Sequence, residues 1–329
     1  MDVDYKEMMI ISLAITMLIG GILLIAYMSN LVVKHAAKLA SALGVSNLVI
    51  GITIVAIGTD IAEIVNSIIS CSIGHGDIDA GDSIGSVLTQ ITLVFGLLPI
   101  ICGGFVVKRK QIIIIGSCVI LSLILIYSVI EKGYFTRLNA IFIICSLVFY
   151  LMVIYNVTKS ELLKEVELIL ISKRCKSKKY HATIMITGLL GVLVSSIIIV
   201  SAVIMLSLRF NANELIISFF ILSIGTSLPE LAVDINAIKR KNYNLAIGDI
   251  LGSCIIDATI SIAIGQLLFP QEVSAKLIIP LIIYTIFASM LVIAVIAWRE
   301  KVDKKSGILF ICIYIGSYFF FFAYLFYFQ

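Results

Sequence analysis

Apolar stretches of about 20 residues recur along the whole chain, separated by short polar or basic segments. Because a helix needs about 20 apolar residues to cross the hydrocarbon core of a bilayer, each stretch predicts a membrane-spanning helix. The second and seventh predicted spans are long and carry polar residues in their middle. We predict ten spans, at residues 8–33, 45–74, 80–104, 111–131, 136–157, 181–208, 212–238, 243–268, 275–298 and 306–328.

Two polar segments of the chain occur twice. AIGTDIAE at 56–63 recurs as SIGTSLPE at 223–230, and GDSIGS at 81–86 recurs as GDILGS at 248–253. One offset of 167 residues aligns both pairs, and ten of the 36 positions from Ile57 onward are identical at that offset. Since each half holds five spans, the halves must lie in opposite orientations, and inverted repeats with interrupted helices are typical of secondary transporters.

The repeat predicts the domain organisation. A first five-helix repeat covers residues 1–158 with its motif at 51–96, and a second covers 181–329 with its motif at 218–263. A basic linker at 159–180 joins them. A duplicated scaffold without a transport role is the alternative, but the identities fall on polar residues, which are costly inside a membrane.

The distribution of basic residues predicts the orientation. Loops that follow odd-numbered spans hold 19 of the 24 lysines and arginines. By the positive-inside rule these loops are cytoplasmic, so both termini face outward from a cell membrane that the chain crosses many times. The 159–180 linker is then cytoplasmic and lies near anionic lipid, and we do not expect it to bind nucleic acid.

Composition excludes several classes of protein. The chain is 61% hydrophobic and only 13% charged, which does not suit a soluble domain. Its seven cysteines and three histidines do not occur at metal-ligand spacing. We therefore expect no disulfide framework, no zinc or copper site and no organic cofactor, and we predict inorganic cations and the lipid bilayer as partners, with no obligatory protein partner.

Polar residues four apart mark both halves of the chain at repeat-related positions. On a helix, residues four apart share one face, and inverted repeats bring such faces together at a pseudo-two-fold axis. The resulting donors are all oxygen atoms, which suits a hard cation such as Ca²⁺, Mg²⁺ or Na⁺. The candidate ligands with side-chain oxygens are Thr59, Asp60, Glu63, Ser86, Gln90, Thr226, Glu230, Ser253 and Asp257.

Two glycines lie just ahead of the polar turns. A helix that breaks at Gly58 or Gly225 frees backbone carbonyl groups, and Ala56 and Ser223 are the predicted carbonyl donors to a cation. Pro229 helps the break in the second half because proline lacks an N–H group.

The motifs resemble the alpha repeats of the sodium/calcium-exchanger type of the cation/calcium exchanger superfamily. That family has a GTSxPE-like turn followed by a GNxxGSNxxN/D-like helix, which 225–230 and 248–257 match well and 58–63 and 81–90 match more loosely. The resemblance implies an all-α membrane protein of ten transmembrane helices, arranged as two inverted five-helix repeats with broken helices 2 and 7.

The resemblance also implies roles for individual residues. Glu63 and Glu230 resemble the central Ca²⁺-binding glutamates, with Thr59 and Thr226 as their partners. Residues at flanking sodium positions are Ala56, Ser86, Ser223 and Ser253, together with Ser227 and Asp60 in the turns. Gln90 and Asp257 occupy the midplane amide or acid positions.

Several positions depart from the family pattern. Asp60 replaces serine, Ala62 replaces proline and Gln90 replaces asparagine. Asparagine is also usual at the positions of Asp82, Val87, Asp249 and Cys254. These departures leave the coupling ion and the stoichiometry open.

The sequence thus predicts a secondary antiporter, not an enzyme, that exchanges Ca²⁺ or another divalent cation against Na⁺. Proton coupling is the nearest alternative. A passive channel is a further alternative, but the sequence has no pore-loop signature. An intramembrane aspartyl protease would have to use the string Gly74-His75-Gly76-Asp77, which falls in a predicted external loop.

Overall fold

The computed structural model describes residues 2–42, 56–169, 178–241 and 243–328. It is an all-α membrane protein, as the sequence predicts. In the first half the helices are α1 (Asp2–Ala42), α3 (Ala56–Thr59), α4 (Ile61–Ser72), α5 (Gly76–Leu88), η2 (Thr89–Val94), α6 (Phe95–Cys102), α7 (Arg109–Ile130) and α8 (Arg137–Ile169). In the second half they are α9 (Lys178–Phe210), α10 (Glu214–Ile217), η3 (Ser218–Leu222), α11 (Ser223–Thr226), α12 (Leu228–Lys239), α13 (Tyr243–Ile256), η4 (Asp257–Ser261), α14 (Ile262–Leu268), α15 (Ala275–Arg299) and α16 (Lys304–Phe328).

Several of these helices join end to end into single membrane spans. Within the described ranges, nine helices are long and apolar enough to cross a bilayer, and Ile61–Ser72 is a shorter apolar helix. That shorter helix, with α3, belongs to the predicted second span, whose earlier residues 45–55 lie outside the described part. The segments η2, η3 and η4 are π-helical turns inside spans, where backbone hydrogen bonds skip one residue further than in an α-helix.

The predicted breaks occur in both repeats, two residues beyond the glycines to which the sequence assigned them. α3 ends at Thr59 and α4 begins at Ile61, and α11 ends and α12 begins at the repeat-related positions. The residues between them are Asp60 and Ser227, with ψ of 5° in both. Gly225 instead permits close packing, because a Cβ atom there would lie 2.6 Å from the side chain of Ile22 on α1.

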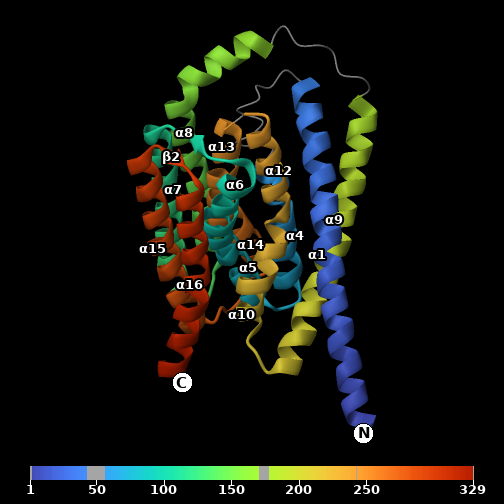
Figure 1. Cartoon of the computed structure of the whole chain (residues 1–329). Coiled ribbons are helices and arrows are strands. Elements are labelled where there is room, and N and C mark those ends of the chain that lie inside the picture. The colour runs from blue at the N-terminus through green and yellow to red at the C-terminus, as the bar shows by residue number, and fades with distance from the viewer. Residues whose placement is uncertain (1, 43–55, 170–177, 242, 329) are drawn as a thin grey trace.

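The polar helices α4, α5, α12 and α13 lie at the centre of the bundle (Figure 1). α7, α8, α15 and α16 cover one flank, while α1 and α9 pack along each other on the opposite flank. One large apolar cluster joins the centre to the first flank, and a smaller one joins α4 to α1 and α9. The centre is thus shielded from lipid on both sides.

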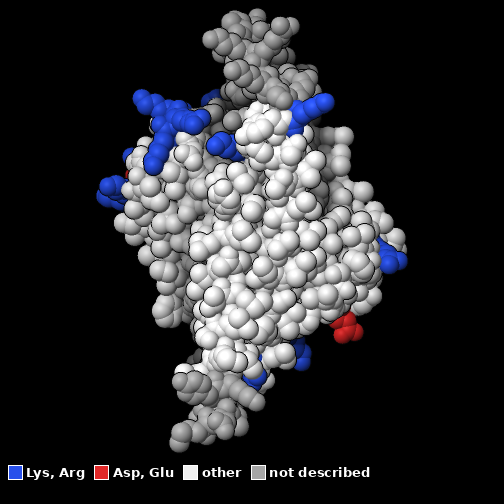
Figure 2. Space-filling view, turned by 90° about the vertical axis from the view of Figure 1, so that its right-hand side faces the viewer, with Lys and Arg blue, Asp and Glu red and all other residues white. Residues whose placement is uncertain are grey.

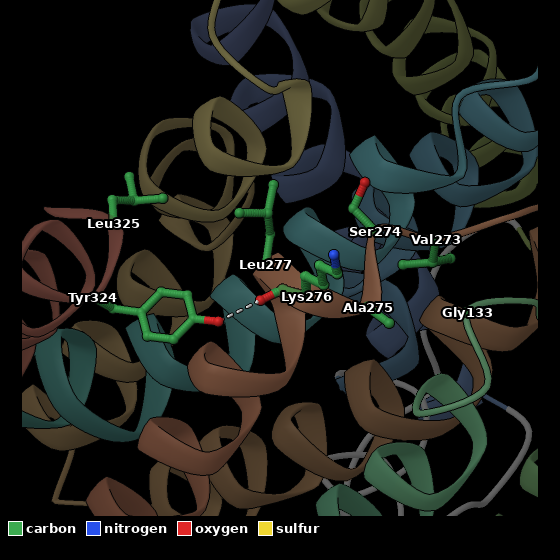
Figure 3. Close-up of a pocket in the computed structure, with 8 residues that line it drawn as sticks. All are labelled: Gly133, Val273, Ser274, Ala275, Lys276, Leu277, Tyr324 and Leu325. Atoms are coloured by element: carbon green, nitrogen blue, oxygen red, sulfur yellow. Dashed lines mark hydrogen bonds between the residues drawn. The ribbon is translucent and has the colours of Figure 1, made fainter. Parts of the chain in front are cut away.

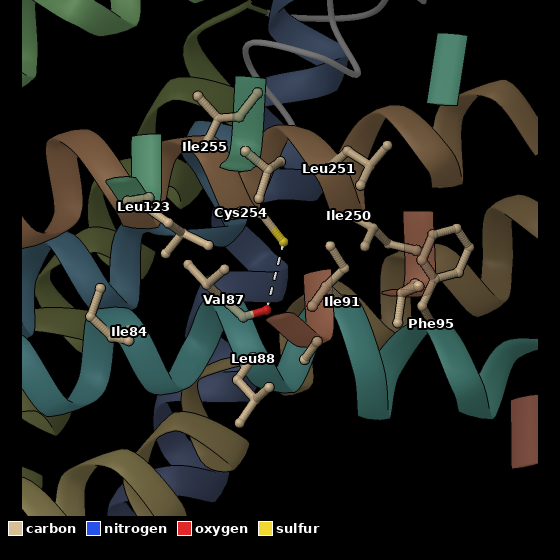
Figure 4. Close-up of a cluster of buried hydrophobic side chains, with 14 of the residues drawn as sticks. Ile84, Val87, Leu88, Ile91, Phe95, Leu123, Ile250, Leu251, Cys254 and Ile255 are labelled. Carbon is tan, nitrogen blue, oxygen red and sulfur yellow. Dashed lines mark hydrogen bonds between the residues drawn. The ribbon is translucent and has the colours of Figure 1, made fainter. Parts of the chain in front are cut away.

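The two repeats meet at an apolar contact between repeat-related residues. Val87 and Cys254 are fully buried, and the Cys254 thiol donates to the Val87 carbonyl oxygen over 3.8 Å (Figure 4). Isoleucines and leucines of α5 and α13 surround them. Two of the departures from the family pattern therefore fill the interface between the repeats with apolar packing.

Both described ends of the chain lie at the same end of the bundle, opposite the C-terminal end of α8 (Figure 1). Strands β1 (Phe105–Val106) and β2 (Lys301–Val302) pair antiparallel and bring basic residues at 108–110 near those at 301–305. Figure 2 shows more lysines and arginines at the upper end than at the lower end, with a broad, largely uncharged belt between them. This arrangement suits a protein whose sides face lipid. The predicted linker begins as a continuation of α8, which extends to Ile169.

Asp303 caps the last helix at the basic end. Its carboxylate accepts hydrogen bonds from the Ser306 amide (3.0 Å) and hydroxyl (3.1 Å) and pairs with Arg299 at 2.7 Å. The Ser306 hydrogen bonds, with help from Arg299, lower the pKa of Asp303 below its usual range. A carboxyl whose pKa is lower in the folded state stabilises the fold above its unfolded pKa and loses that effect as pH falls through the folded value.

The cap gives a prediction about stability. We expect Asp303→Ala to destabilise the purified protein by about 1 kcal/mol, because the first-turn amides lose their acceptor. Asp303→Asn, which keeps a capping oxygen, should cost less. Thermal unfolding in detergent at neutral pH measures both, and equal melting temperatures for wild type and Asp303→Ala would contradict the capping role.

Candidate functional site

Three buried carboxyl groups meet between the first helix break and the π-helical turn η4. One carboxylate oxygen from each of Asp60, Glu63 and Asp257 lies within 4.8 Å of the others. All three side chains are buried, with at most 1% of their surface exposed. Asp60 occupies the first break, Glu63 the first turn of α4, and Asp257 the start of η4. The first break and the turn η4 therefore direct side chains from both repeats into one space.

A π-helical turn shapes each of the two facing helices. Gln90 lies in η2 and Asp257 in η4, at positions related by the repeat. The Gln90 amide donates to Asp257 over 3.0 Å, which ties the two turns together. π-Helical turns often occur at functional sites because they displace a side chain from the regular helical position.

The hydroxyl groups pair across the repeats in a symmetric pattern. Thr59 of the first repeat lies 3.4 Å from the Ser253 hydroxyl of the second, and Thr226 of the second lies 3.3 Å from Ser86 of the first. Ser86 also donates to Glu63 over 3.5 Å. The structure thus brings the four predicted helix faces together, with hydroxyl oxygens flanking the carboxylates.

Glu230 completes the cluster beside Asp60. The carboxylate oxygens of Glu230 and Asp60 are all buried and accept no hydrogen bond from any residue in the described ranges. Burying an ionised carboxylate without a partner costs several kcal/mol, so such groups are usually paired or bind a cation. The donor set contains carboxylate, hydroxyl and amide oxygens, which fits a hard cation.

Three predicted residues lie at the edge of the cluster. The Ser223 hydroxyl donates to the Phe219 carbonyl oxygen over 2.5 Å and lies 3.3 Å from that of Thr89. The Ser223 carbonyl, which the sequence predicted to be freed by the break, accepts hydrogen bonds from the Ser227 amide (3.2 Å) and the Thr226 hydroxyl (3.3 Å). The Ser227 hydroxyl is buried in the second break and has no partner among the described residues. Ala56 begins α3, and its side chain lies outside the described part. Cys175, in the predicted linker, also lies outside it.

Sequence reasoning missed the role of Asn66 and left that of Asp82 undecided. Asp82 accepts hydrogen bonds from the Asn66 amide (3.0 Å) and from the Thr226 hydroxyl (3.1 Å). Asp82 therefore fixes the position of the Thr226 hydroxyl. A polar stripe at helical spacing along α3 and α4, formed by Thr59, Glu63 and Asn66, is the signal that could have identified the asparagine.

Comparisons with known proteins identify the family of this chain. The profile of the family described as "Sodium/calcium exchanger protein" matches residues 13–159 and 180–323. The chain belongs to the sodium/calcium exchanger protein family. An uncharacterized membrane protein of Methanocaldococcus jannaschii is 30% identical over 295 residues, which cover 90% of this chain and 93% of the relative. Sodium/calcium exchanger MaX1 of Methanosarcina acetivorans is 36% identical over 84 residues, or 26% of this chain and 24% of the relative.

A solved structure of an exchanger shares the fold. The sodium-calcium exchanger NCX_Mj, soaked with 2.5 mM Na⁺ and 0.1 mM Ca²⁺, superposes with a TM-score of 0.62 at 27% identity, covering 93% of this chain and 97% of the other. The exchanger family and its fold identify the chain as a multi-pass membrane transporter of cations and not as an enzyme.

A hollow on the surface lies apart from the carboxylate cluster. It has a volume of about 540 Å³ and is lined by Gly133, residues 273–277, Tyr324 and Leu325 (Figure 3). Its lining is mostly apolar, and the Tyr324 hydroxyl donates to the Lys276 carbonyl oxygen over 3.2 Å. It offers none of the clustered carboxylates that a hard cation requires.

Proposed function

We propose that this exchanger carries Ca²⁺, or another divalent cation, in one direction and Na⁺ in the other by alternating access. The observation that carries the proposal is the buried cluster of Asp60, Glu63 and Asp257 with Glu230 beside it. The solved relative is named a sodium-calcium exchanger and was soaked with both ions. Inverted repeats around a midplane site allow the site to face each side of the membrane in turn.

Each group in the cluster has a proposed role. Glu63 and Glu230, one from each repeat, hold the divalent ion with Asp257. The flanking oxygens bind Na⁺ or complete the coordination sphere. They are the hydroxyls of Thr59, Thr226, Ser86, Ser253 and Ser227, the amide of Gln90, the Asp60 carboxylate and the backbone carbonyls of Ala56 and Ser223.

Proton coupling is the second candidate, because the count of charges leaves room for a bound proton. Four carboxyl groups carry four negative charges when ionised, whereas one divalent cation offsets only two. The remaining charges must be balanced by a proton or by another cation. A protease reading has no support, because the carboxylate of Asp77 instead accepts hydrogen bonds from the Ser274 amide and hydroxyl.

Reconstitution into liposomes tests the exchange directly. Uptake of radioactive calcium is measured with an outward Na⁺ gradient, with an outward proton gradient and with neither. We expect the Na⁺ gradient to drive uptake above the level without a gradient. Uptake driven only by the proton gradient would favour the second candidate, and flux that needs no counter-ion would indicate a channel.

The proposed orientation has its own test. We propose that both termini face outward and that the 159–180 linker is cytoplasmic, because 19 of 24 basic residues fall on one side. In a variant whose only cysteine is Cys175, we expect no reaction with a membrane-impermeant thiol reagent in intact cells and full reaction after lysis. Labelling in intact cells would reverse the orientation.

A further inference from the structure

Two buried acids that the proposed ion site does not use face each other one helical turn away from it. Asp234 of α12 and Asp249 of α13 are both fully buried, and their carboxyl groups lie close enough to interact. α12 and α13 pack against each other, and the two acids lie one on each of these helices.

The carboxylates of this pair have no donors. All four of their oxygens are buried and have no hydrogen-bond partner in the described part of the chain. No lysine or arginine of the described ranges forms an ion pair with either acid. Two adjacent, unpartnered carboxylates repel each other and cost several kcal/mol to bury, so the pair requires a positive charge that the described side chains do not supply.

The other repeat provides an internal comparison. Asp82, the repeat-related equivalent of Asp249, is satisfied by the Asn66 amide and the Thr226 hydroxyl. In the second repeat Val233 stands at the position of Asn66, and Asp234 stands where the first repeat has Ser67. The second repeat therefore has no amide donor where the first has Asn66, and it has an additional acid at the next position. For this reason the Asp82 carboxylate has hydrogen-bond donors, whereas Asp249 and Asp234 have none among the described residues.

The location connects the pair to the ion path. Asp234 follows Glu230 by four residues on one face of α12, which is about 6 Å along the helix axis. Beyond Asp234, α12 continues for five residues to Lys239 at the basic end of the bundle, and Asp249 lies in the middle of α13. An ion that moves between the Glu230 side of the cluster and that end would pass beside them.

We propose that Asp234 and Asp249 form a second binding site for a small hard cation, Na⁺ or Ca²⁺, between the carboxylate cluster and the α12–α13 end of the protein. The inference rests on the proposed function for the identity of the ions, but the acids, their burial and their missing partners are independent of it. Carboxylate oxygens are the preferred ligands of both ions.

Equilibrium binding to the purified protein in lipid nanodiscs tests the site. Radioactive calcium is titrated by flow dialysis without Na⁺, and sodium binding is followed separately by sodium-23 NMR. For a Ca²⁺ site, we expect about two ions per wild-type chain and about one in Asp234→Asn/Asp249→Asn. For a Na⁺ site, we expect the double variant to bind as much Ca²⁺ as wild type, and we expect sodium-23 NMR to detect less bound Na⁺ in the double variant than in wild type.

Matched variants separate this site from the main cluster. Asp82→Asn makes the same change at the repeat-related position, where the carboxylate already has hydrogen-bond donors. This variant should still bind the cation that we assign to Asp234 and Asp249. In a Glu63→Gln background we expect the proposed exchange to be lost, but cation binding at Asp234 and Asp249 should remain. The second site can therefore be detected even if the proposed function is wrong. Asp249→Asn alone serves if the double variant does not fold, since asparagine is the residue usual at that position in the family.

Two results would overturn the proposal. One is equal binding of both Ca²⁺ and Na⁺ by wild type and by the double variant. The other is a double variant whose cation binding is unchanged while only the pH dependence of transport shifts, which would mean that the pair shares a proton. Added Ca²⁺ or Na⁺ should also raise the melting temperature of wild type more than that of the double variant, because a ligand stabilises the state that binds it.

Discussion

The Glu63→Gln variant is expected to lose divalent-cation transport while still inserting into the membrane and folding. Glutamine has nearly the shape of glutamate but lacks its charge, and Glu63 lies at the centre of the cluster with Asp60 and Asp257. Removing one partner of a buried charge interaction costs about 3–5 kcal/mol, which corresponds to at least a 100-fold loss of affinity. Calcium uptake by proteoliposomes measures the effect.

The second repeat should respond in the same way. Glu230→Gln changes the equivalent residue, which lies buried beside Asp60. Glu214→Gln provides the matched control, because that glutamate contacts His75 at 2.7 Å away from the cluster and should leave transport near the wild-type rate. Wild-type uptake by either cluster variant, at normal expression, would remove that glutamate from the ion site.

The sequence sufficed for the arrangement of the cluster because membranes restrict polar residues so strongly. A carboxylate inside an apolar span is costly and therefore indicates a functional role. The repeat offset of 167 residues then pairs Glu63 with Glu230. Inverted symmetry then predicts that the faces meet. The cross-repeat contacts of Thr59 with Ser253 and of Ser86 with Thr226 have the expected symmetry.

Other details depend on backbone geometry that spacing alone does not reveal. A π-helical turn adds one residue to the helical period, so the orientation of Gln90 and Asp257 cannot be read from a count of four. The Ser223 hydroxyl donates to the Phe219 carbonyl oxygen of η3, the π-helical turn that immediately precedes it, and also lies near Thr89. The break itself falls where the chain leaves the helix at Asp60, and not at the preceding glycine.

Packing between repeats also escapes the sequence pattern. In the sequence, Val87 and Cys254 stand at positions where the family usually has asparagine, which suggests a change at the ion site. In the structure they contact each other inside an apolar cluster. The helical spacing of Thr59, Glu63 and Asn66 marks the asparagine but does not give its role, because one amide in a span has many explanations. Only its hydrogen bond to Asp82, which in turn accepts from Thr226, shows that it supports the cluster.

The Asp60→Ser variant is expected to make transport less sensitive to acid and to shift its Na⁺ dependence. In wild type, Asp60 adds a fourth carboxyl group beside Glu63, Glu230 and Asp257, and one divalent cation offsets only half of their charge. Protons and Na⁺ both compete for the uncompensated oxygens. Serine, which the second repeat has at Ser227 and which is usual in the family, removes one charge and keeps an oxygen.

The measurement compares calcium uptake across a pH series and a Na⁺ series. We expect wild-type uptake to fall between about pH 8 and pH 6, because protonated carboxyl groups no longer bind the cation, and to fall less steeply in Asp60→Ser. Asp77→Asn controls for the loss of an acid elsewhere, because Asp77 accepts hydrogen bonds from Ser274 outside the cluster and should keep the wild-type profile. Identical pH and Na⁺ profiles for wild type and Asp60→Ser would show that Asp60 does not take part in ion binding, even though its carboxylate lies within 4.8 Å of the other two.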